Sequence, residues 1–210
     1  MARQRVRIHF AKQGDLRLIS HRDLMRTWER LFRRAGVALA MTEGFHPKPK
    51  MMFPSALAVG IEGLDEVLEI ELPEEYEPER LAELFGAHAP PGLDVQSVEP
   101  LGGGGKTRLR GMTFQVDVPA ERRAFVAERM EWLRQQSSYR VTREGRSAPI
   151  ELRPLIEELR LDDDGTLGMR LRVEGDGSAR PREVLEALGL ADVEALGIVL
   201  RRTAVELSSS

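Results

Sequence analysis

The segment from Ile19 to Gly36, ISHRDLMRTWERLFRRAG, constrains the fold most, because its apolar and charged residues separate onto two sides of a helix. One side carries six apolar residues at helical spacing: Leu24, Met25, Trp28, Leu31, Phe32 and Ala35. The other side carries five arginines: Arg22, Arg26, Arg30, Arg33 and Arg34. Ser20 with Asp23 three residues later resembles a capping box. We therefore expect a helix with one packed face and one strongly cationic face.

The residues that follow cannot continue this helix. Glu43 to Lys50 reads EGFHPKPK, in which two prolines lack a backbone donor and Gly44 permits unusual backbone angles. His46, Lys48 and Lys50 add polar and cationic groups to the same stretch. We expect a rigid, exposed, basic loop directly after the arginine helix.

The formal net charge of -3 conceals a strong asymmetry. Residues 1–50 hold twelve basic and four acidic side chains, a net +8, which leaves -11 for the remaining 160 residues. Such segregation suggests that the N-terminal region meets a polyanion. The alternative is a solvated helix face that pairs internally with the acidic part of the chain. The arginine side of the helix has few acidic partners within the helix, which favours the polyanion.

Several kinds of chemistry are excluded by the composition. The chain has no cysteine, so it forms no disulfide, thiolate zinc site or iron-sulfur cluster and has no cysteine nucleophile. No Ser-His-Asp spacing or dinucleotide fingerprint occurs, and Pro100 stands where a phosphate loop ending in Lys106 and Thr107 would need glycine. We expect no cofactor. Met1 leads directly into a strand pattern, without an apolar run of signal or membrane-spanning length, so we expect a cytoplasmic protein that enters no membrane.

Three histidines lie in the basic region: His9, His21 and His46. Their spacing does not indicate a metal site, and we expect none. His21 stands at the start of the helix, where a phosphate could also bind. It is therefore a candidate for an RNA contact or a proton transfer.

The periodicity predicts the order βαββαβ in the first half of the chain. After a strand marked by Val6, Ile8 and Phe10 and the arginine helix come four further elements: strands Ala56–Ile61 and Glu66–Leu72, helix Pro78–His88 and strand Leu93–Val98. The same order restarts after a glycine-rich linker. It begins with strand Met112–Val118, helix Ala120–Gln135 and the strand-like Tyr139–Val141, and the apolar residues of the helix are Phe125, Met130, Trp132 and Leu133. A hairpin follows, in which Ile156–Leu161 and Leu167–Val173 flank the turn Asp162–Gly165. The last two elements are helix Pro181–Leu188 and strand Gly197–Leu207.

The predicted fold class is therefore α+β, with two tandem ferredoxin-like domains. The boundaries are a basic N-terminal domain over residues 1–100, a linker over 101–107 and an acidic C-terminal domain over 108–210. The arrangement of residues 143–154 stays open.

A family resemblance rests on the first domain. VRIHFAKQGDLRLISHRDLMRTWERLFRRAGV, TEGFHPKPKMMFPSALAVGIEG and DEVLEIEL, within Arg3 to Leu72, resemble the bacterial radical SAM-linked family, a domain of unknown function also found fused to B12-binding-type radical SAM proteins. Members tend to be encoded beside a radical SAM protein, ribonuclease G and ribosomal proteins, which implies an RNA or ribosome setting and a radical SAM partner. Without cysteine, this chain would be the companion and not the cluster-bearing enzyme.

The first domain also looks like the RAMP-type CRISPR repeat-processing endoribonucleases, which often use a histidine near the first helix. The nearest equivalents here are His21 and His46, but the glycine-rich loop of those nucleases is not evident around Gly197.

These observations give three hypotheses of function. The first is a non-catalytic RNA-binding accessory protein of a radical SAM enzyme, which docks a structured RNA or ribonucleoprotein by shape and charge. Its expected contacts are Arg22, Arg26, Arg30, Arg33, Arg34, His46, Lys48 and Lys50. The second is a scaffold that binds the radical SAM partner without RNA. The third is a metal-independent endoribonuclease with His21 or His46 as the catalytic acid or base.

Overall fold

Strand β1 (Gln4–Lys12) is the central strand of the first part of this computed structural model, which describes residues 3–102, 105, 107–145, 148–174 and 177–209. It pairs antiparallel with β3 (Glu62–Leu72) on one side and with β4 (Leu93–Pro100) on the other. The short strand β2 (Met51–Met52) pairs with residues 69–70 of β3. The strand order is therefore β2, β3, β1, β4.

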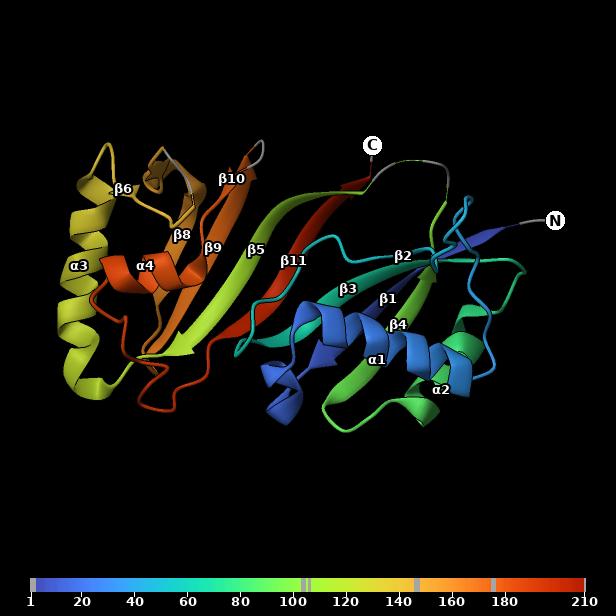
Figure 1. Cartoon of the computed structure of the whole chain (residues 1–210). Coiled ribbons are helices and arrows are strands. Elements are labelled where there is room, and N and C mark those ends of the chain that lie inside the picture. Colours follow the sequence, from blue (N-terminus) through green and yellow to red (C-terminus); the bar gives the residue numbers. More distant parts are fainter. Residues whose placement is uncertain (1–2, 103–104, 106, 146–147, 175–176, 210) are drawn as a thin grey trace. The chain divides into compact units, whose positions relative to one another are not determined.

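Two α-helices cover one face of these strands (Figure 1). After the 3-10 helix η1 (Gly14–Leu18) comes α1 (His21–Arg34), and α2 (Pro78–His88) lies between β3 and β4 in the chain. The predicted capping of α1 is confirmed, because the Ser20 hydroxyl accepts a hydrogen bond from the Asp23 amide and donates one of 2.7 Å to the Asp23 carboxylate. The predicted bounds of α2 are also confirmed, with Pro78 in the first turn as expected.

Aromatic side chains pack these two helices against the sheet. Trp28 of α1 is fully buried, with its ring 5.1 Å from that of Phe10 and 5.4 Å from that of Phe32. Phe32 in turn meets Phe85 of α2 at 5.1 Å, edge to face. Since alternate residues of a strand point to opposite faces, burying Phe10 and its apolar neighbours on β1 leaves Arg5, Arg7 and His9 on the other face.

The strand predicted over Ala56–Ile61 is wrong. This stretch is irregular, and the Gly60 amide bonds the Arg17 carbonyl instead of a sheet partner. Gly60 has a φ of 90°, which lies outside the extended range of regular strand residues. The turn predicted over Glu62–Asp65 is instead the start of β3, and the two-residue β2 pairs with β3 where the sequence predicted a longer strand.

In the second part of the chain, β5 (Thr107–Asp117) pairs antiparallel with β9 (Thr166–Glu174), which also pairs with β8 (Ile156–Leu161) and β10 (Gly177–Ser178). β11 (Arg201–Ser209) lies beside β5. The predicted hairpin of β8 and β9 is confirmed, and its turn has Gly165 at a φ of 93°. Asp164 stabilises the turn, because its carboxylate accepts a hydrogen bond from the Thr166 amide.

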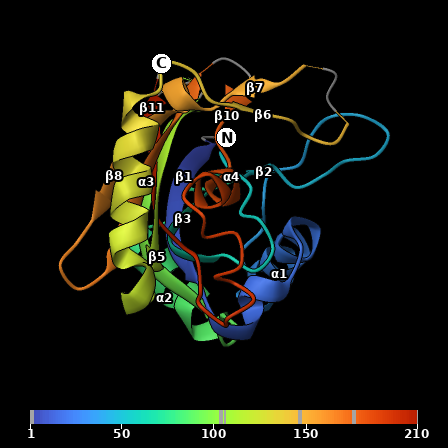
Figure 2. The same ribbon diagram turned by 90° about the vertical axis from the view of Figure 1, so that its left-hand side faces the viewer.

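Helices α3 and α4 belong to this second part (Figure 2). The helix predicted over Ala120–Gln135 is present as the 3-10 helix η2 (Ala120–Arg122) followed by α3 (Arg123–Gln135), and α4 (Pro181–Ala187) begins with the predicted proline. The buried residues of α3 recur at the spacing of a helix face: Val126, Met130 and Leu133. Phe125 and Trp132, which also mark this helix as apolar in the sequence, are 52% and 38% exposed.

The segment left open in the sequence holds short elements. β6 (Arg140–Val141) pairs with β7 (Ile150–Glu151), and η3 (Arg153–Leu155) leads into β8; residues 146–147 lie outside the described residues. Within the predicted linker, residues 103–104 and 106 also lie outside them.

The architecture is α+β, with four α-helices in the described residues. The chain divides into two compact units: unit 1 is Met1–Arg108 with Leu207–Ser210, and unit 2 is Leu109–Glu206. No helix among the described residues is long and apolar enough to cross a membrane.

Candidate nucleic-acid interface

The outer side of α1 presents the arginines that the sequence predicts there. Arg22, Arg26, Arg30 and Arg33 are all exposed and follow one another at intervals of four, four and three residues, so they line one side of the helix. At 1.5 Å per residue this row is about 16 Å long. The capping that fixes the start of α1 therefore also fixes the start of the cationic row.

The side chains of Arg22, Arg30 and Arg33 make no ion pair or hydrogen bond with any residue that the structure describes. Arg26 lies 3.4 Å from the Asp23 carboxylate, but both side chains are more than half exposed, so that pair is weak. The Ser20 hydroxyl, with help from the positive charges of Arg26 and Arg22, lowers the pKa of Asp23. The row thus keeps at least three cations available to an external anion.

Two of the predicted contact residues are engaged elsewhere. Arg34 donates a hydrogen bond of 2.9 Å to the His88 carbonyl at the end of α2. Lys50 is half-buried and holds both carboxylate oxygens of Glu71 at 2.9 Å. These two residues anchor the surroundings of the row and are less available to a ligand than Arg22, Arg30 and Arg33.

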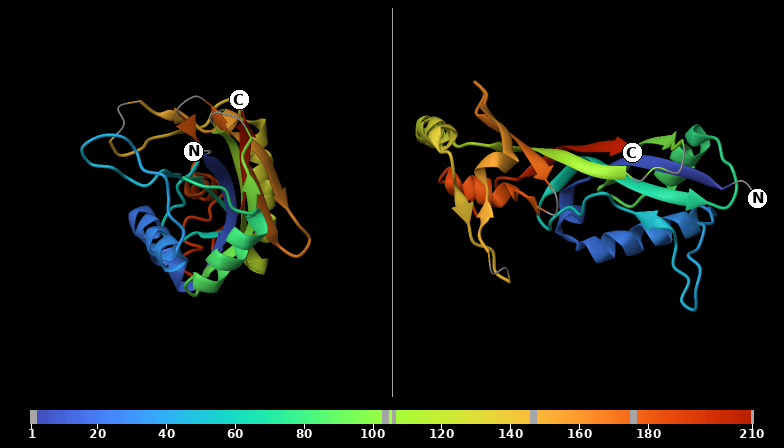
Figure 3. Two further views of the ribbon diagram at one scale, coloured as in Figure 1. Left: turned by 90° about the vertical axis from the view of Figure 1, so that its right-hand side faces the viewer. Right: turned by 90° about the horizontal axis from the view of Figure 1, so that it is seen from above.

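The predicted basic loop is a hairpin over residues 40–50, and we call it the 40–50 hairpin. Its stem is held by backbone hydrogen bonds from Thr42 to the Lys48 carbonyl and from Lys50 to the Ala40 carbonyl, and the Thr42 hydroxyl accepts the Lys48 amide. Further bonds to Glu71 attach its base to β3. The hairpin stands out on the side of the unit 1 sheet that carries α1 (Figure 3).

The tip of the 40–50 hairpin is fully open to solvent. Phe45 is 101% exposed, and His46 and Lys48 beside it are exposed and make no side-chain hydrogen bond or ion pair within the described residues. Gly44 adopts a φ of 121° that turns the chain at this point. An aromatic ring and polar, cationic groups are thus presented together.

A shallow depression of about 240 Å³ joins the hairpin to α1. Its walls are Glu29, Phe32 and Arg33 of α1 together with Val37, Leu39, Met41 and Pro49 around the hairpin base. Arg33 therefore belongs both to the helix row and to the foot of the hairpin. We call Arg22, Arg30, Arg33, His46 and Lys48 the basic surface.

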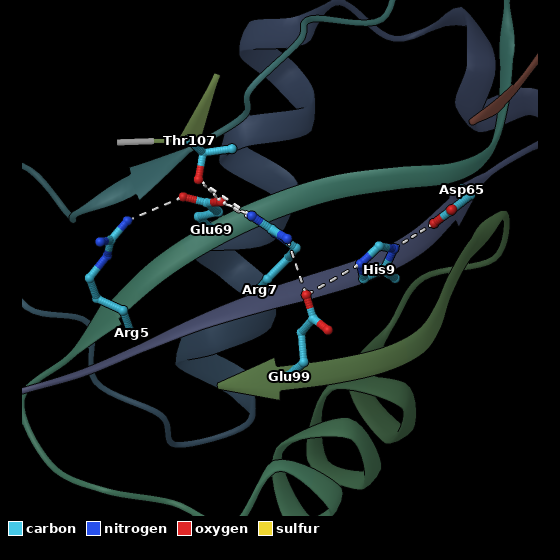
Figure 4. Close-up of polar contacts among 7 residues, drawn as sticks. All are labelled: Arg5, Arg7, His9, Asp65, Glu69, Glu99 and Thr107. Carbon is cyan, nitrogen blue, oxygen red and sulfur yellow. Dashed lines mark hydrogen bonds and ion pairs between the residues drawn. The ribbon is translucent and has the colours of Figure 1, made fainter. Parts of the chain in front are cut away.

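The arginines of β1 behave differently. On the outer face of the sheet, Arg5 and Arg7 both bind Glu69, at 3.4 and 2.8 Å, and the Thr107 hydroxyl donates to the same carboxylate at 2.6 Å (Figure 4). The Glu69 side chain is only 4% exposed. Arg7 also reaches Glu99 at 3.2 Å. These cations are neutralised within the protein, and the sequence could not show it because Glu69 lies more than 60 residues away in the chain.

His9 belongs to this outer-face network. Its Nδ1 lies 2.6 Å from an Asp65 oxygen, and its Nε2 lies 3.9 Å from Glu99 (Figure 4). The network occupies β1, β3 and β4 with charged side chains that satisfy one another. The sheet face of unit 1 is therefore a poor platform for stacking bases, in contrast to the hairpin tip.

His21, the other predicted candidate for chemistry, is half-buried at the first position of α1. Its ring packs edge to face on Phe53 at 5.0 Å, and its Nδ1 is buried and has no hydrogen-bond partner among the residues that the structure describes. Burial, and secondarily the positive charge of Lys12, lower the pKa of His21. His46 lies on the hairpin, which rises from the other end of α1 (Figure 1). The structure thus does not pair the two histidines.

Lys12, which the sequence did not single out, is fully buried on β1 and donates to the Ile19 carbonyl just before α1. No group of three or more His, Cys, Asp or Glu side chains that could hold a metal ion occurs in the described parts of the chain.

A protein-family model matches residues 5–181 of the chain, and its description is "Uncharacterized protein conserved in bacteria (DUF2344)". The chain belongs to this family. The DUF2344 match includes the whole basic surface. No curated protein matches the chain.

Two solved structures have a weak similarity to the chain in sequence and in structure. An unknown protein from Galdieria sulphuraria is 11% identical, with 100% of this chain and 99% of that chain covered and a TM-score of 0.30. A protein described as "putative glycine cleavage system transcriptional repressor" is 9% identical, with 100% of both chains covered and a TM-score of 0.28. Scores this low carry no conclusion for the DUF2344 chain.

Proposed function

We propose that this protein binds structured RNA or a ribonucleoprotein through the basic surface and does so as a non-catalytic accessory of a partner enzyme. The observation that carries the proposal is the contrast between the two sets of arginines. Those of β1 are neutralised by buried or nearby carboxylates, whereas Arg22, Arg30 and Arg33 are exposed and form no ion pair or hydrogen bond with any described residue. Unpaired, exposed guanidinium groups in a row suit a ligand with repeated phosphates.

The strand orders support a finer description of the fold, in which both units are ferredoxin-like. Unit 1 has the order β2, β3, β1, β4 with helices after its first and third strands. In unit 2, β8, β9, β5 and β11 are neighbours in the same sense, with α3 after β5 and α4 after β9. A βαββαβ chain with this antiparallel order defines the ferredoxin-like unit.

The proposed partner is a radical SAM protein. This part of the proposal rests on the resemblance of residues 3–72 to the radical SAM-linked family. The lack of cysteine fits a division of labour, because the cluster would have to belong to the partner. The rival, a scaffold that binds the partner through the same arginines and touches no RNA, is an outcome of the test below.

The test is a salt titration of binding to a labelled structured RNA with three proteins. The first is wild type, and the second carries Arg22→Gln, Arg30→Gln and Arg33→Gln. The third is a charge-matched control with Arg80→Gln, Arg140→Gln and Arg172→Gln, all exposed arginines paired with local surface acids. We expect the second protein to bind the RNA more weakly than wild type. The slope of its log K against log salt should be smaller in magnitude by about 2 to 3, since each lost phosphate contact reduces that slope by nearly one.

Equal affinities and slopes for all three proteins would contradict the proposal. The scaffold would be established instead by three results together: a partner protein co-purifies after nuclease treatment, the triple change abolishes this co-purification, and no RNA fragment is protected.

A further inference from the structure

We propose that Phe45 stacks on an unpaired base of the bound RNA, so that the protein selects RNA with a single-stranded loop or bulge beside the phosphates held by α1. This inference rests on the proposed function. It names a feature of the ligand that charge alone does not specify, because phosphates are present in paired and unpaired RNA alike.

The first observation is that Phe45 does nothing for the fold. Its exposure of 101% means that the ring buries no area against unit 1. By contrast, Phe10, Phe32, Phe53 and Phe85 each lie within 5.0 to 6.2 Å of another aromatic ring. Within the described residues of unit 1, Phe45 is the one exposed side chain among the phenylalanines, tryptophan and tyrosine. A large apolar side chain placed this way indicates a contact with another molecule.

The second observation is that the backbone carrying the ring is held in a defined place. The hairpin stem has paired backbone groups from Ala40 to Lys50, and its base is bonded to Glu71 of β3. Pro47 and Pro49 limit the backbone freedom of the descending side. Since the hairpin backbone is ordered in advance, stacking requires ordering of the Phe45 side chain but little additional ordering of the main chain.

The third observation is the charge around the ring. His46 and Lys48 flank it and Arg33 lies at the foot of the hairpin, while Glu43 is the one acidic side chain of the tip. A purely apolar partner surface would leave these cations without a counter-charge. An unpaired nucleotide offers both parts, a base with a π-face for the ring and phosphates for the cations.

The sheet of unit 1 cannot supply this stacking. Its outer face is filled by the network of Arg5, Arg7, Glu69 and Glu99, and its other face is covered by α1 and α2. The hairpin therefore takes the role that exposed aromatic residues on the sheet take in other RNA-binding folds.

The experiment compares two RNAs of equal charge: a stem closed by a single-stranded loop that carries 2-aminopurine, and a fully paired duplex. Phe45→Ala should reduce affinity for the loop RNA roughly 5- to 150-fold, the range for loss of one base stack, and leave duplex affinity and the salt slope unchanged. Phe45→Trp should restore loop affinity and quench the 2-aminopurine. Met52→Ala, which removes another exposed apolar side chain of unit 1, is the matched control and should bind as wild type does.

If Phe45→Ala binds the loop RNA as tightly as wild type does, this inference is wrong. The binding proposal would still stand if the triple arginine change weakens binding to both RNAs. Wild-type protein that binds neither RNA would overturn the proposed function itself, and the inference with it.

Discussion

At the scale of single residues, side chains of one type differ sharply in what surrounds them. Arg7 and Arg30 are both arginines of the basic first fifty residues, yet Arg7 is 13% exposed and ion-paired whereas Arg30 is exposed and has no partner among the described residues. The charge count that suggested a polyanion treats them alike. Only the environment of each guanidinium shows which of them can take a phosphate.

His21 makes the stability of unit 1 depend on pH in a defined direction. Because burial lowers its pKa in the folded protein, the unfolded chain binds more protons at this site between the folded value and about pH 6.5. Stability should therefore rise with pH through that window and fall as the pH drops through it. His21→Gln should flatten this slope, measured as the free energy of unfolding in urea between about pH 5 and pH 7.

His46→Gln is the control for loss of a histidine at an exposed site. A slope that is the same in wild type and His21→Gln would show that the buried imidazole does not carry the dependence. The Phe53 contact contributes equally at all pH values in this window, so its loss lowers the curve without changing its slope.

At the scale of elements, the sequence predicted those helices and turns that depend on patterns of neighbouring residues. α1, α2, α4 and the hairpin of β8 and β9 follow from capping residues, helix-start prolines and a glycine turn, all local signals. The strand expected over Ala56–Ile61 failed because apolar content alone does not reveal a left-handed glycine. The outer-face network could not be foreseen, since it depends on the register of β1 against β3 and β4.

That network should stabilise the pairing of the three strands. Glu69→Gln removes the buried carboxylate charge that Arg5 and Arg7 share, so we expect the free energy of unfolding to fall by about 2–3 kcal/mol. This is less than the 3–5 kcal/mol of a fully buried pair, because Arg5 is 30% exposed. Glu99→Gln, at a carboxylate that is 51% exposed and bound to the same Arg7, should cost less than about 1 kcal/mol. Equal losses in the two variants would argue against a special role for the buried carboxylate.

At the scale of the whole molecule, unit 1 is discontinuous in sequence. Met1–Arg108 is joined by Leu207–Ser210, and Leu207 is half-buried there. A chain that stops after Glu206 should lose hydrogen-exchange protection in β1 and β3 by roughly fivefold, about 1 kcal/mol for part of one leucine, while β9 keeps its protection. Loss of protection in β9 alone would show that the last residues serve unit 2 instead.

The interrupted course of unit 1 also sets an order of events during synthesis. Unit 2 spans Leu109–Glu206, 98 residues counted from those bounds, so at 5–20 residues per second its translation takes about 5–20 s. Throughout that interval the nascent unit 1 waits for its final strand residues. The basic surface is drawn entirely from residues 22–48, so its cations leave the ribosome, itself an RNA machine, well before the unit that carries them is complete.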